Sequence, residues 1–205
     1  MATEPTVFIV DDDAAMRDSL RWLLESVGLS AETFGTAEEF LRAYAPQRPG
    51  CLVLDVRMPG MSGLSLQDTL VGRKVRLPII IVTGYAEVPT AVRALKTGAV
   101  DFLQKPFSDD VLLERVRLAI ELDREARAAQ ARRADADARY AQLTTREREV
   151  MALVVAGKPN KVIAAELNLS PKTVEVHRAN VMKKMEADSV AELVRLAILL
   201  GEAVS

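Results

Sequence analysis

The sequence predicts two domains of different class: a doubly wound α/β domain on a five-stranded parallel sheet, followed by a small all-α domain of four helices. A chain of 205 residues, 49% of them hydrophobic and only 4% aromatic, is long enough to bury two aliphatic cores. Short apolar runs alternate with helical patterns as far as about residue 123, whereas only helical patterns follow residue 143. These patterns predict a first domain over 1–122, a linker over 123–142 and a second domain over 143–205.

Five apolar runs in the first domain have the length of strands. The run IIIVT is apolar at four consecutive positions, which suits a strand that is covered on both faces. Strands that alternate with helical segments form parallel sheets with right-handed crossovers. The predicted strands are 6–11, 30–34, 51–55, 79–83 and 100–104.

The segments between these runs carry signals for the start and end of helices. Asp13 precedes AAMRDSL and is expected to cap the first helix. Thr36 and Glu39 have the spacing of a capping box ahead of FLRAY. Gly28 and Gly98 stand where two helices should end, since glycine readily adopts the left-handed conformation of a helix C-terminus.

A long helix is predicted to begin after Ser108 and to continue through LDREARAAQARRADADARYAQL. This stretch is rich in alanine and charged residues and lacks glycine and proline, so a helical connector is favoured over a flexible one. Near-heptad spacing of apolar residues gives the hypothesis of a helix-pairing seam, although the seam contains few large side chains. Its residues are Leu118, Leu122, Ala129, Ala136 and Leu143.

Four short helices are predicted in the second domain. Thr144 and Glu147 form a capping box for TREREVMALVV, and Gly157 ends that helix. KVIAAEL is the second helix, and the serine–proline pair at 170–171 starts the third. Ser189 opens the fourth helix, AELVRLAILL.

Polar residues that can carry chemistry follow the predicted strands. Three aspartates, residues 11–13, follow the first strand, and Asp55 ends the third. In the strand order 2-1-3-4-5 these strands are neighbours, so the carboxylates converge at the edge where ligands bind in open parallel sheets. Clustered carboxylates repel one another unless a cation lies between them, and their hard oxygens suit Mg²⁺. Thr83 and Lys105 follow the last two strands and add a hydroxyl and an ammonium group.

The first 120 residues resemble the receiver domain of two-component response regulators, which has a flavodoxin-like fold. The motifs that carry the resemblance are VFIVDDDAAMRDSL, LVLDVRMPGMSGL, IIIVTGYAE and DFLQKPF, in this order and spacing. The resemblance implies that Asp55 takes a phosphoryl group from a phosphohistidine on a sensor histidine kinase. It also implies a Mg²⁺ (or Mn²⁺) ion held by Asp12, Asp55 and the backbone carbonyl of Arg57, with Asp11 acting chiefly through water. Arg57 departs from the family pattern, in which a shorter polar residue is common.

The same resemblance assigns the remaining receiver residues. Thr83 and Lys105 would bind phosphoryl oxygens, and the Lys105–Pro106 peptide bond is expected to be cis. Thr83 and Phe102 would form the switch, although a plain core role for Phe102 is the alternative. Phosphorylation would then change the face formed by the fourth helix, the fifth strand and the fifth helix, through which related regulators form homodimers.

The second domain resembles the LuxR-type helix-turn-helix of FixJ- and NarL-like regulators, and the whole chain resembles the FixJ-like branch. The stretch from LTTREREV to LVRLAI carries this resemblance. On the third helix, Val174, Val181 and Met185 share one face and are expected in the core. The opposite face and its flanks would enter the major groove of double-stranded DNA. These residues are Lys172, Thr173, Glu175, Val176, Arg178, Ala179, Asn180 and Lys183.

Glu175 is unusual on a surface that binds DNA, and two interpretations of it stay open. It accepts a hydrogen bond from a cytosine amino group, or it pairs with Lys172 or Arg178 along the helix. Four basic residues and one acidic residue lie between residues 170 and 184, which is compatible with nucleic-acid binding.

The chain is predicted to regulate transcription according to its phosphorylation state and not to be an enzyme itself. An aspartate-nucleophile phosphohydrolase is the alternative, but such enzymes usually need a second acid where Arg57 stands. RNA polymerase is a candidate partner. The sequence shows no signal peptide and no membrane span, and the single Cys51 lies in a buried run, so we expect a cytoplasmic protein without disulfides.

Overall fold

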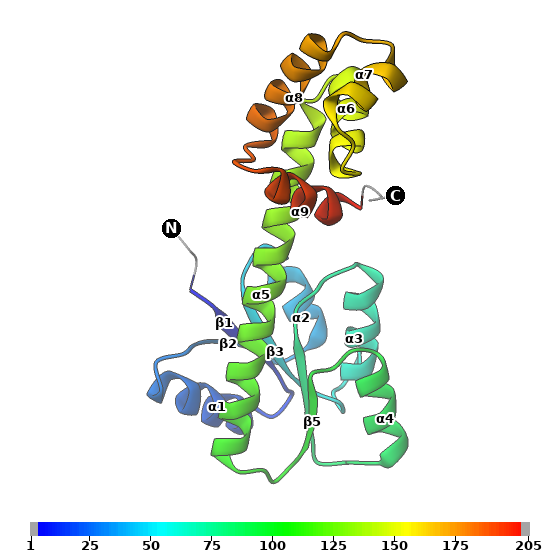
Figure 1. Ribbon diagram of the computed structural model, residues 1–205. Coiled ribbons are helices and arrows are strands. Elements are labelled where there is room, and N and C mark those ends of the chain that lie inside the picture. The colour runs from blue at the N-terminus through cyan, green and yellow to red at the C-terminus, as the bar shows by residue number, and fades with distance from the viewer. Residues whose placement is uncertain (1–3, 202–205) are drawn as a thin grey trace. The chain divides into compact units, whose positions relative to one another are not determined.

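Figure 1 shows the computed structural model of the chain, which describes residues 4–201. The chain divides into two compact units, Met1–Arg127 and Ala128–Ser205. The division falls inside one long helix, α5 (Asp109–Ala141), beyond the end predicted for the first domain at residue 122. The helical connector expected between the domains is thus part of a continuous helix.

The N-terminal unit contains a parallel five-stranded sheet in the order β2-β1-β3-β4-β5. This confirms the predicted doubly wound fold, and each strand lies within one residue of its predicted bounds. Because the first and third strands are hydrogen-bonded neighbours, their carboxyl ends meet at one edge of the sheet. The strands are β1 (Thr6–Val10), β2 (Ser30–Phe34), β3 (Gly50–Asp55), β4 (Ile79–Thr83) and β5 (Asp101–Gln104).

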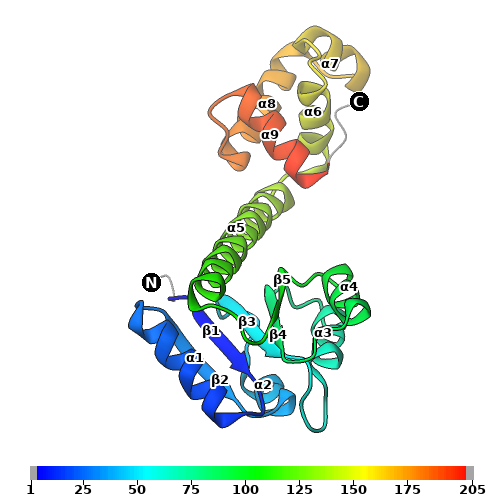
Figure 2. The same ribbon diagram turned by 90° about the horizontal axis from the view of Figure 1, so that it is seen from below.

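Helices cover both faces of this sheet (Figure 2). One face packs on α1 (Ala14–Ser26) and on α5. The other face packs on α2 (Ala37–Ala43), α3 (Gly63–Gly72) and α4 (Val88–Lys96). Successive residues of each strand enter opposite cores, which explains why these strands are apolar at almost every position.

Cys51 lies in the core between the sheet and the α1 and α5 helices, as its apolar context predicts. Burial raises the pKa of its thiol to about 12, and the nearby Asp123 carboxylate adds to the shift. The thiol is therefore protonated at neutral pH and acts as a small apolar side chain.

The helix caps are mostly those that the sequence predicts. Asp13 caps α1 by accepting hydrogen bonds from the amides of Ala15 and Met16, at 2.9 and 3.3 Å. Thr36 accepts from the amide of Glu39, but the Glu39 carboxylate accepts from the amide of Gly35, at 2.9 Å, and not from Thr36. The predicted capping box is therefore wrong in its second bond, because the extended backbone at Thr36 brings the preceding amide within reach.

The α5 helix does not present the predicted seam as one free face. Ala136 and Leu143 are buried, whereas Leu118 and Leu122 are exposed. A buried side chain cannot also face the helix of a second chain, so the predicted seam is interrupted at Ala136 on α5 and at Leu143, which follows the end of that helix.

A buried ion pair fixes α5 to the sheet. The Asp123 carboxylate accepts from the backbone amide of Gly50 at 2.9 Å and from Nε of Arg127 at 2.7 Å. The Arg127 guanidinium donates in addition to the carbonyl oxygens of residues 46–48, at 3.1, 3.1 and 2.7 Å. These bonds join the helix to the loop before β3 across more than 70 residues of sequence.

The C-terminal unit contains the four predicted short helices after the end of α5. Thr144 and Glu147 form the expected capping box, and the Glu147 carboxylate also accepts from Nζ of Lys184 at 2.6 Å. In the described part of the chain, no helix combines the length and the apolar character that a membrane crossing requires. The helices are α6 (Thr145–Val155), α7 (Asn160–Leu167), α8 (Pro171–Met185) and α9 (Val190–Leu200).

Candidate functional site

An ammonium group joins two carboxylates at the carboxyl edge of the sheet. Nζ of Lys105 lies 2.6 Å from Oδ2 of Asp11 and 3.0 Å from Oδ1 of Asp55. Asp11 is 1% exposed and Asp55 is 5% exposed. Three side chains from the ends of β1, β3 and β5 thus meet as the strand order predicts, even though they are far apart in sequence.

Backbone groups hold the second oxygen of each carboxylate. Oδ1 of Asp11 accepts from the amide of Asp13 at 3.0 Å, and Oδ2 of Asp55 accepts from the amide of Arg57 at 2.6 Å. Arg17 donates to the backbone carbonyl of Asp11 at 2.7 Å, a role that the sequence analysis missed. Its position one helical turn after the Asp13 cap is the only signal that pointed to it.

The charges of this cluster do not balance. Burial raises the pKa of Asp55, and the nearby Asp11 carboxylate adds to this, while Lys105 and the amide of Arg57 act in the opposite direction. For Lys105, burial alone would lower the pKa, but the hydrogen bonds to both carboxylates outweigh it, so the pKa is raised. Two carboxylates facing one ammonium group leave a net negative charge, which favours binding of a further cation.

Thr83 is fully buried at the end of β4. Its hydroxyl oxygen accepts from the amide of Tyr85 at 3.3 Å, and its carbonyl accepts from the amide of Lys105 at 2.8 Å. The Lys105–Pro106 peptide bond is cis, as the family resemblance implies. Phe102 is partly buried and packs against the core on the α2, α3 and α4 side of the sheet.

The Arg57 side chain is held away from the carboxylates. Its guanidinium carbon lies 3.7 Å from the centroid of the Tyr85 ring, and its Nη2 lies 3.8 Å from a carboxylate oxygen of Glu87. Two loops, after β3 and after β4, are therefore joined by a cation–π contact close to Asp55. The side chain that departs from the family pattern thus leaves its own backbone amide and carbonyl available to the site.

The chemistry of this donor set fits Mg²⁺. Magnesium is usually held by one or two carboxylates, with water and phosphate oxygens completing six ligands. Asp11 and Asp55 supply two such groups, and both already lie beside a cation. Asp12 is exposed, and within residues 4–201 no three His, Cys, Asp or Glu side chains are gathered as a preformed metal site. The ligand set expected from Asp11, Asp12, Asp55 and the Arg57 carbonyl stays a prediction.

On α8, the structure separates a core face from an exposed face. Val174, Val181 and Met185 are buried, as predicted. The side chains expected at DNA lie outside this core. Arg178 is partly buried and donates to Oδ1 of Asn160 at 3.0 Å. The exposed residues of the predicted set are Lys172, Glu175, Val176, Ala179, Asn180 and Lys183, and Thr173 is partly exposed.

Comparison with known families agrees with this division. Residues 7–117 match the response regulator receiver domain, and residues 141–197 match the bacterial regulatory proteins of the LuxR family. Receiver domains of this kind receive phosphoryl groups from histidine kinases and generally bind Mg²⁺ at their acidic pocket, and the second domain binds DNA.

The chain is also similar to individual proteins over nearly its whole length. It is 48% identical to the transcriptional regulatory protein FixJ of Bradyrhizobium diazoefficiens, with 98% of each chain covered. The solved structure of the response regulator StyR matches with a TM-score of 0.89 and 43% identity, covering 96% of this chain and 99% of that one. Full-length FixJ from B. japonicum matches with a TM-score of 0.60 and 48% identity, covering 98% and 100%. The chain therefore belongs to the FixJ/NarL family of two-component response regulators, which control transcription according to their phosphorylation state.

Proposed function

We propose that Asp55 is the phosphoryl acceptor. A carboxylate oxygen of Asp55 attacks the phosphorus of a phosphohistidine on the partner kinase, a P–O bond forms, and the P–N bond breaks with histidine nitrogen as the leaving group. The observation that carries this proposal is the Lys105 ammonium 3.0 Å from Asp55, at the buried edge of the sheet. A fixed cation beside the nucleophile stabilises charge on the transferring group without reorganisation.

The neighbouring residues have separate tasks in this step. Lys105 and the Thr83 hydroxyl would bind oxygens of the phosphoryl group, and the amide of Arg57 orients Asp55. Asp11 holds the Lys105 ammonium in place at 2.6 Å. A bound Mg²⁺ ion, held by Asp11, Asp12, Asp55 and the Arg57 carbonyl, would neutralise charge on the phosphoryl oxygens.

Acetyl phosphate and mass spectrometry test the acceptor. The wild-type chain should gain one phosphoryl group that hydroxylamine removes, whereas Asp55→Asn should gain none. Asp68→Asn is the matched control, because Asp68 is an exposed aspartate on α3 that pairs with Arg93. Stable labelling of the Asp55→Asn protein would show that the acceptor is another residue.

The Thr83 hydroxyl connects the acceptor site with α4. It accepts from the Tyr85 amide in this structure, so movement of Thr83 toward a phosphoryl oxygen would break that bond and free the loop before α4. We propose that this movement, together with a change at Phe102, shifts the α4–β5–α5 face between two states.

An apolar stripe on α4 supports dimerisation through this face. Val88, Val92 and Leu95 recur at helical spacing and are 76%, 43% and 47% exposed. Sedimentation after treatment with acetyl phosphate should show dimers of the wild type but not of Asp55→Asn or Val92→Glu. Equal dimerisation of all three proteins would contradict this coupling.

The C-terminal unit would bind double-stranded DNA by placing α8 in the major groove. A dimer should prefer two half-sites about 10 bp apart, or a multiple of this. Its affinity should fall steeply with salt, because each phosphate contact releases counterions. An affinity that does not change with salt would contradict binding through the basic residues of α8.

The chain acts in this proposal as a phosphoprotein and transcription factor without a separate catalytic activity. A phosphohydrolase is the alternative, and it usually needs an acid where Arg57 stands. Sustained release of phosphate from small phosphate esters would favour the alternative. A single turnover that ends with loss of the label from Asp55 fits the main proposal. Contact with RNA polymerase and a cytoplasmic location stay predictions.

A further inference from the structure

The exposed side of α8 combines basic, acidic and apolar side chains, and we name it the reading face. It lies opposite the buried residues of the helix. Val176 lies in the centre of this face and is 56% exposed, although a valine side chain gains nothing from contact with water. On the proposed DNA-binding face, the methyl groups of this side chain are free to contact an apolar group of the bound partner. The residues of the reading face are Lys172, Glu175, Val176, Ala179 and Lys183.

Glu175 is exposed and forms no hydrogen bond or ion pair with any residue in the described range 4–201. The two cations one turn away on the same helix are Lys172 and Arg178. Arg178 instead donates to Asn160 on α7 at 3.0 Å, which ties it to the neighbouring helix. Of the two interpretations that the sequence leaves open, pairing along the helix has no support in the structure.

An unpaired carboxylate on a surface that approaches DNA has an electrostatic cost. It repels the phosphates of every sequence, so it weakens binding to all duplexes alike. A base that offers an amino hydrogen in the major groove offsets this cost, and cytosine presents its N4 amino group there. A free glutamate thus lowers non-specific affinity and raises the affinity for one kind of base pair.

We propose that Glu175 is a specificity-determining residue that accepts a hydrogen bond from the N4 amino group of a cytosine in each half-site. The exposed methyl groups of Val176 then contact the C5-methyl group of a neighbouring thymine, and the small Ala179 lets the helix approach the bases closely. Lys172 and Lys183 bind phosphates on either side. This inference rests on the proposed binding of DNA through α8.

Selection of duplexes from a random pool tests the proposal on the full chain after acetyl phosphate treatment. The wild-type motif should contain an invariant C·G pair in each half-site, and Glu175→Ala should accept any base at that one position. Lys172→Ala is the matched variant, because it should keep the motif and lower the salt slope by about one. If Glu175→Ala selects the same motif as the wild type, the proposed contact with cytosine is wrong, but DNA binding through α8 is not affected. If the wild type selects no duplex, binding through α8 fails as well.

A base analogue tests the single hydrogen bond. The selected cytosine is replaced by 2-pyrimidinone, which lacks the 4-amino group. Wild-type affinity should fall about 5- to 150-fold, the usual discrimination of a good base contact, whereas the affinity of Glu175→Ala should not change. Equal losses for both proteins would show that Glu175 does not touch this amino group. If affinity falls only when an adenine is replaced, Glu175 contacts adenine and not cytosine, and the proposal is overturned.

Discussion

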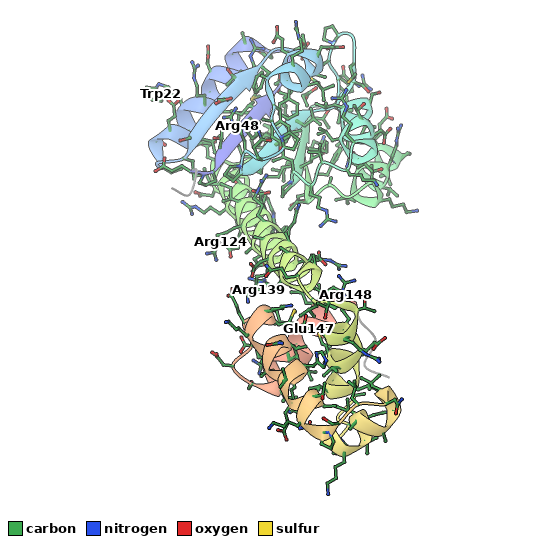
Figure 3. The ribbon with its side chains drawn as sticks, turned by 90° about the horizontal axis from the view of Figure 1, so that it is seen from above. Trp22, Arg48, Arg124, Arg139, Glu147 and Arg148 are labelled. Carbon is green, nitrogen blue, oxygen red and sulfur yellow. The ribbon has the colours of Figure 1, made fainter. Side chains whose placement is uncertain are left out.

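The buried Glu147 carboxylate should be a main source of stability in the C-terminal unit. It lies at the start of α6 (Figure 3) and is 3% exposed. Its oxygen accepts from the amide of Thr144 at 2.8 Å and from Nζ of Lys184 at 2.6 Å. A hydrogen bond to a charged group contributes about 1.5–3 kcal/mol. Because Lys184 is one-third exposed and can turn to water, we expect Glu147→Ala to cost about 2–4 kcal/mol rather than the full sum.

Hydrogen exchange on the full chain measures this loss locally. Amides of α6 that exchange through opening of the C-terminal unit should exchange about 30- to 1,000-fold faster in Glu147→Ala, since about 1.4 kcal/mol corresponds to a factor of ten. Glu149→Ala is the matched control. Glu149 is on the same helix, but it and its partner Arg146 are 41% and 48% exposed and so stay accessible to water, and the change should be within about threefold. If the two variants exchange at similar rates, the assignment of stability to Glu147 is wrong.

The acid limb of the stability curve provides a second test of the same group. Burial alone would raise the pKa of Glu147, but the bonds from Lys184 and Thr144 outweigh it and lower the pKa from 4.5. A lowered folded-state pKa means that the stabilisation is complete above the unfolded value and is lost as pH falls through the folded value. The protection difference between wild type and Glu147→Gln should therefore be constant near neutrality and shrink below about pH 4.5. A difference that grows on acidification would refute the sign of the shift.

Three further predictions concern the N-terminal unit. Gly50→Ala should prevent folding of the sheet, because a Cβ atom there would lie 1.8 Å from the carbonyl oxygen of the first residue of β1; near-native circular dichroism would contradict this. Arg127→Gln removes the partner of the buried Asp123 and should destabilise the unit by about 3–5 kcal/mol in urea titrations, against less than about 1 kcal/mol for an exposed pair. Arg57→Ala removes the cation–π contact that joins the loops after β3 and β4 beside the acceptor, so these loops should open more often to water and the phosphoryl half-life should shorten about two- to fivefold; an unchanged half-life would show that this contact does not control hydrolysis.

The local elements of this protein could be predicted from the sequence because their signals act within one or two turns of chain. Asp13 caps α1, Thr144 and Glu147 form their box, and Val174 and Val181 point into the core of the C-terminal unit. Each of these features depends on residues at most seven positions apart, so the pattern of the sequence alone determines them.

The sequence could predict which residues form the candidate site, but not the hydrogen bonds between them. Strand order brings Asp11, Asp55 and Lys105 to one edge, and this follows from the sequence pattern. Two details depend on the register of the strands and on the path of two loops. The Lys105 ammonium contacts both carboxylates, and Asp12 is exposed beside them. Side-chain direction at a loop is set by packing, which the pattern does not encode.

Only the tertiary structure decided the long-range pairs. The Asp123 carboxylate bonds to Gly50, 73 residues away, and Arg178 bonds to Asn160 on another helix, which leaves Glu175 unpaired. Each of these charged side chains had a plausible local partner in the sequence. Asp123 keeps its local partner Arg127 and gains the Gly50 amide, whereas Arg178 bonds to Asn160 and not to Glu175. A desolvated charge is stable only where several fixed donors or acceptors surround it, and such a set exists only after the helices have packed.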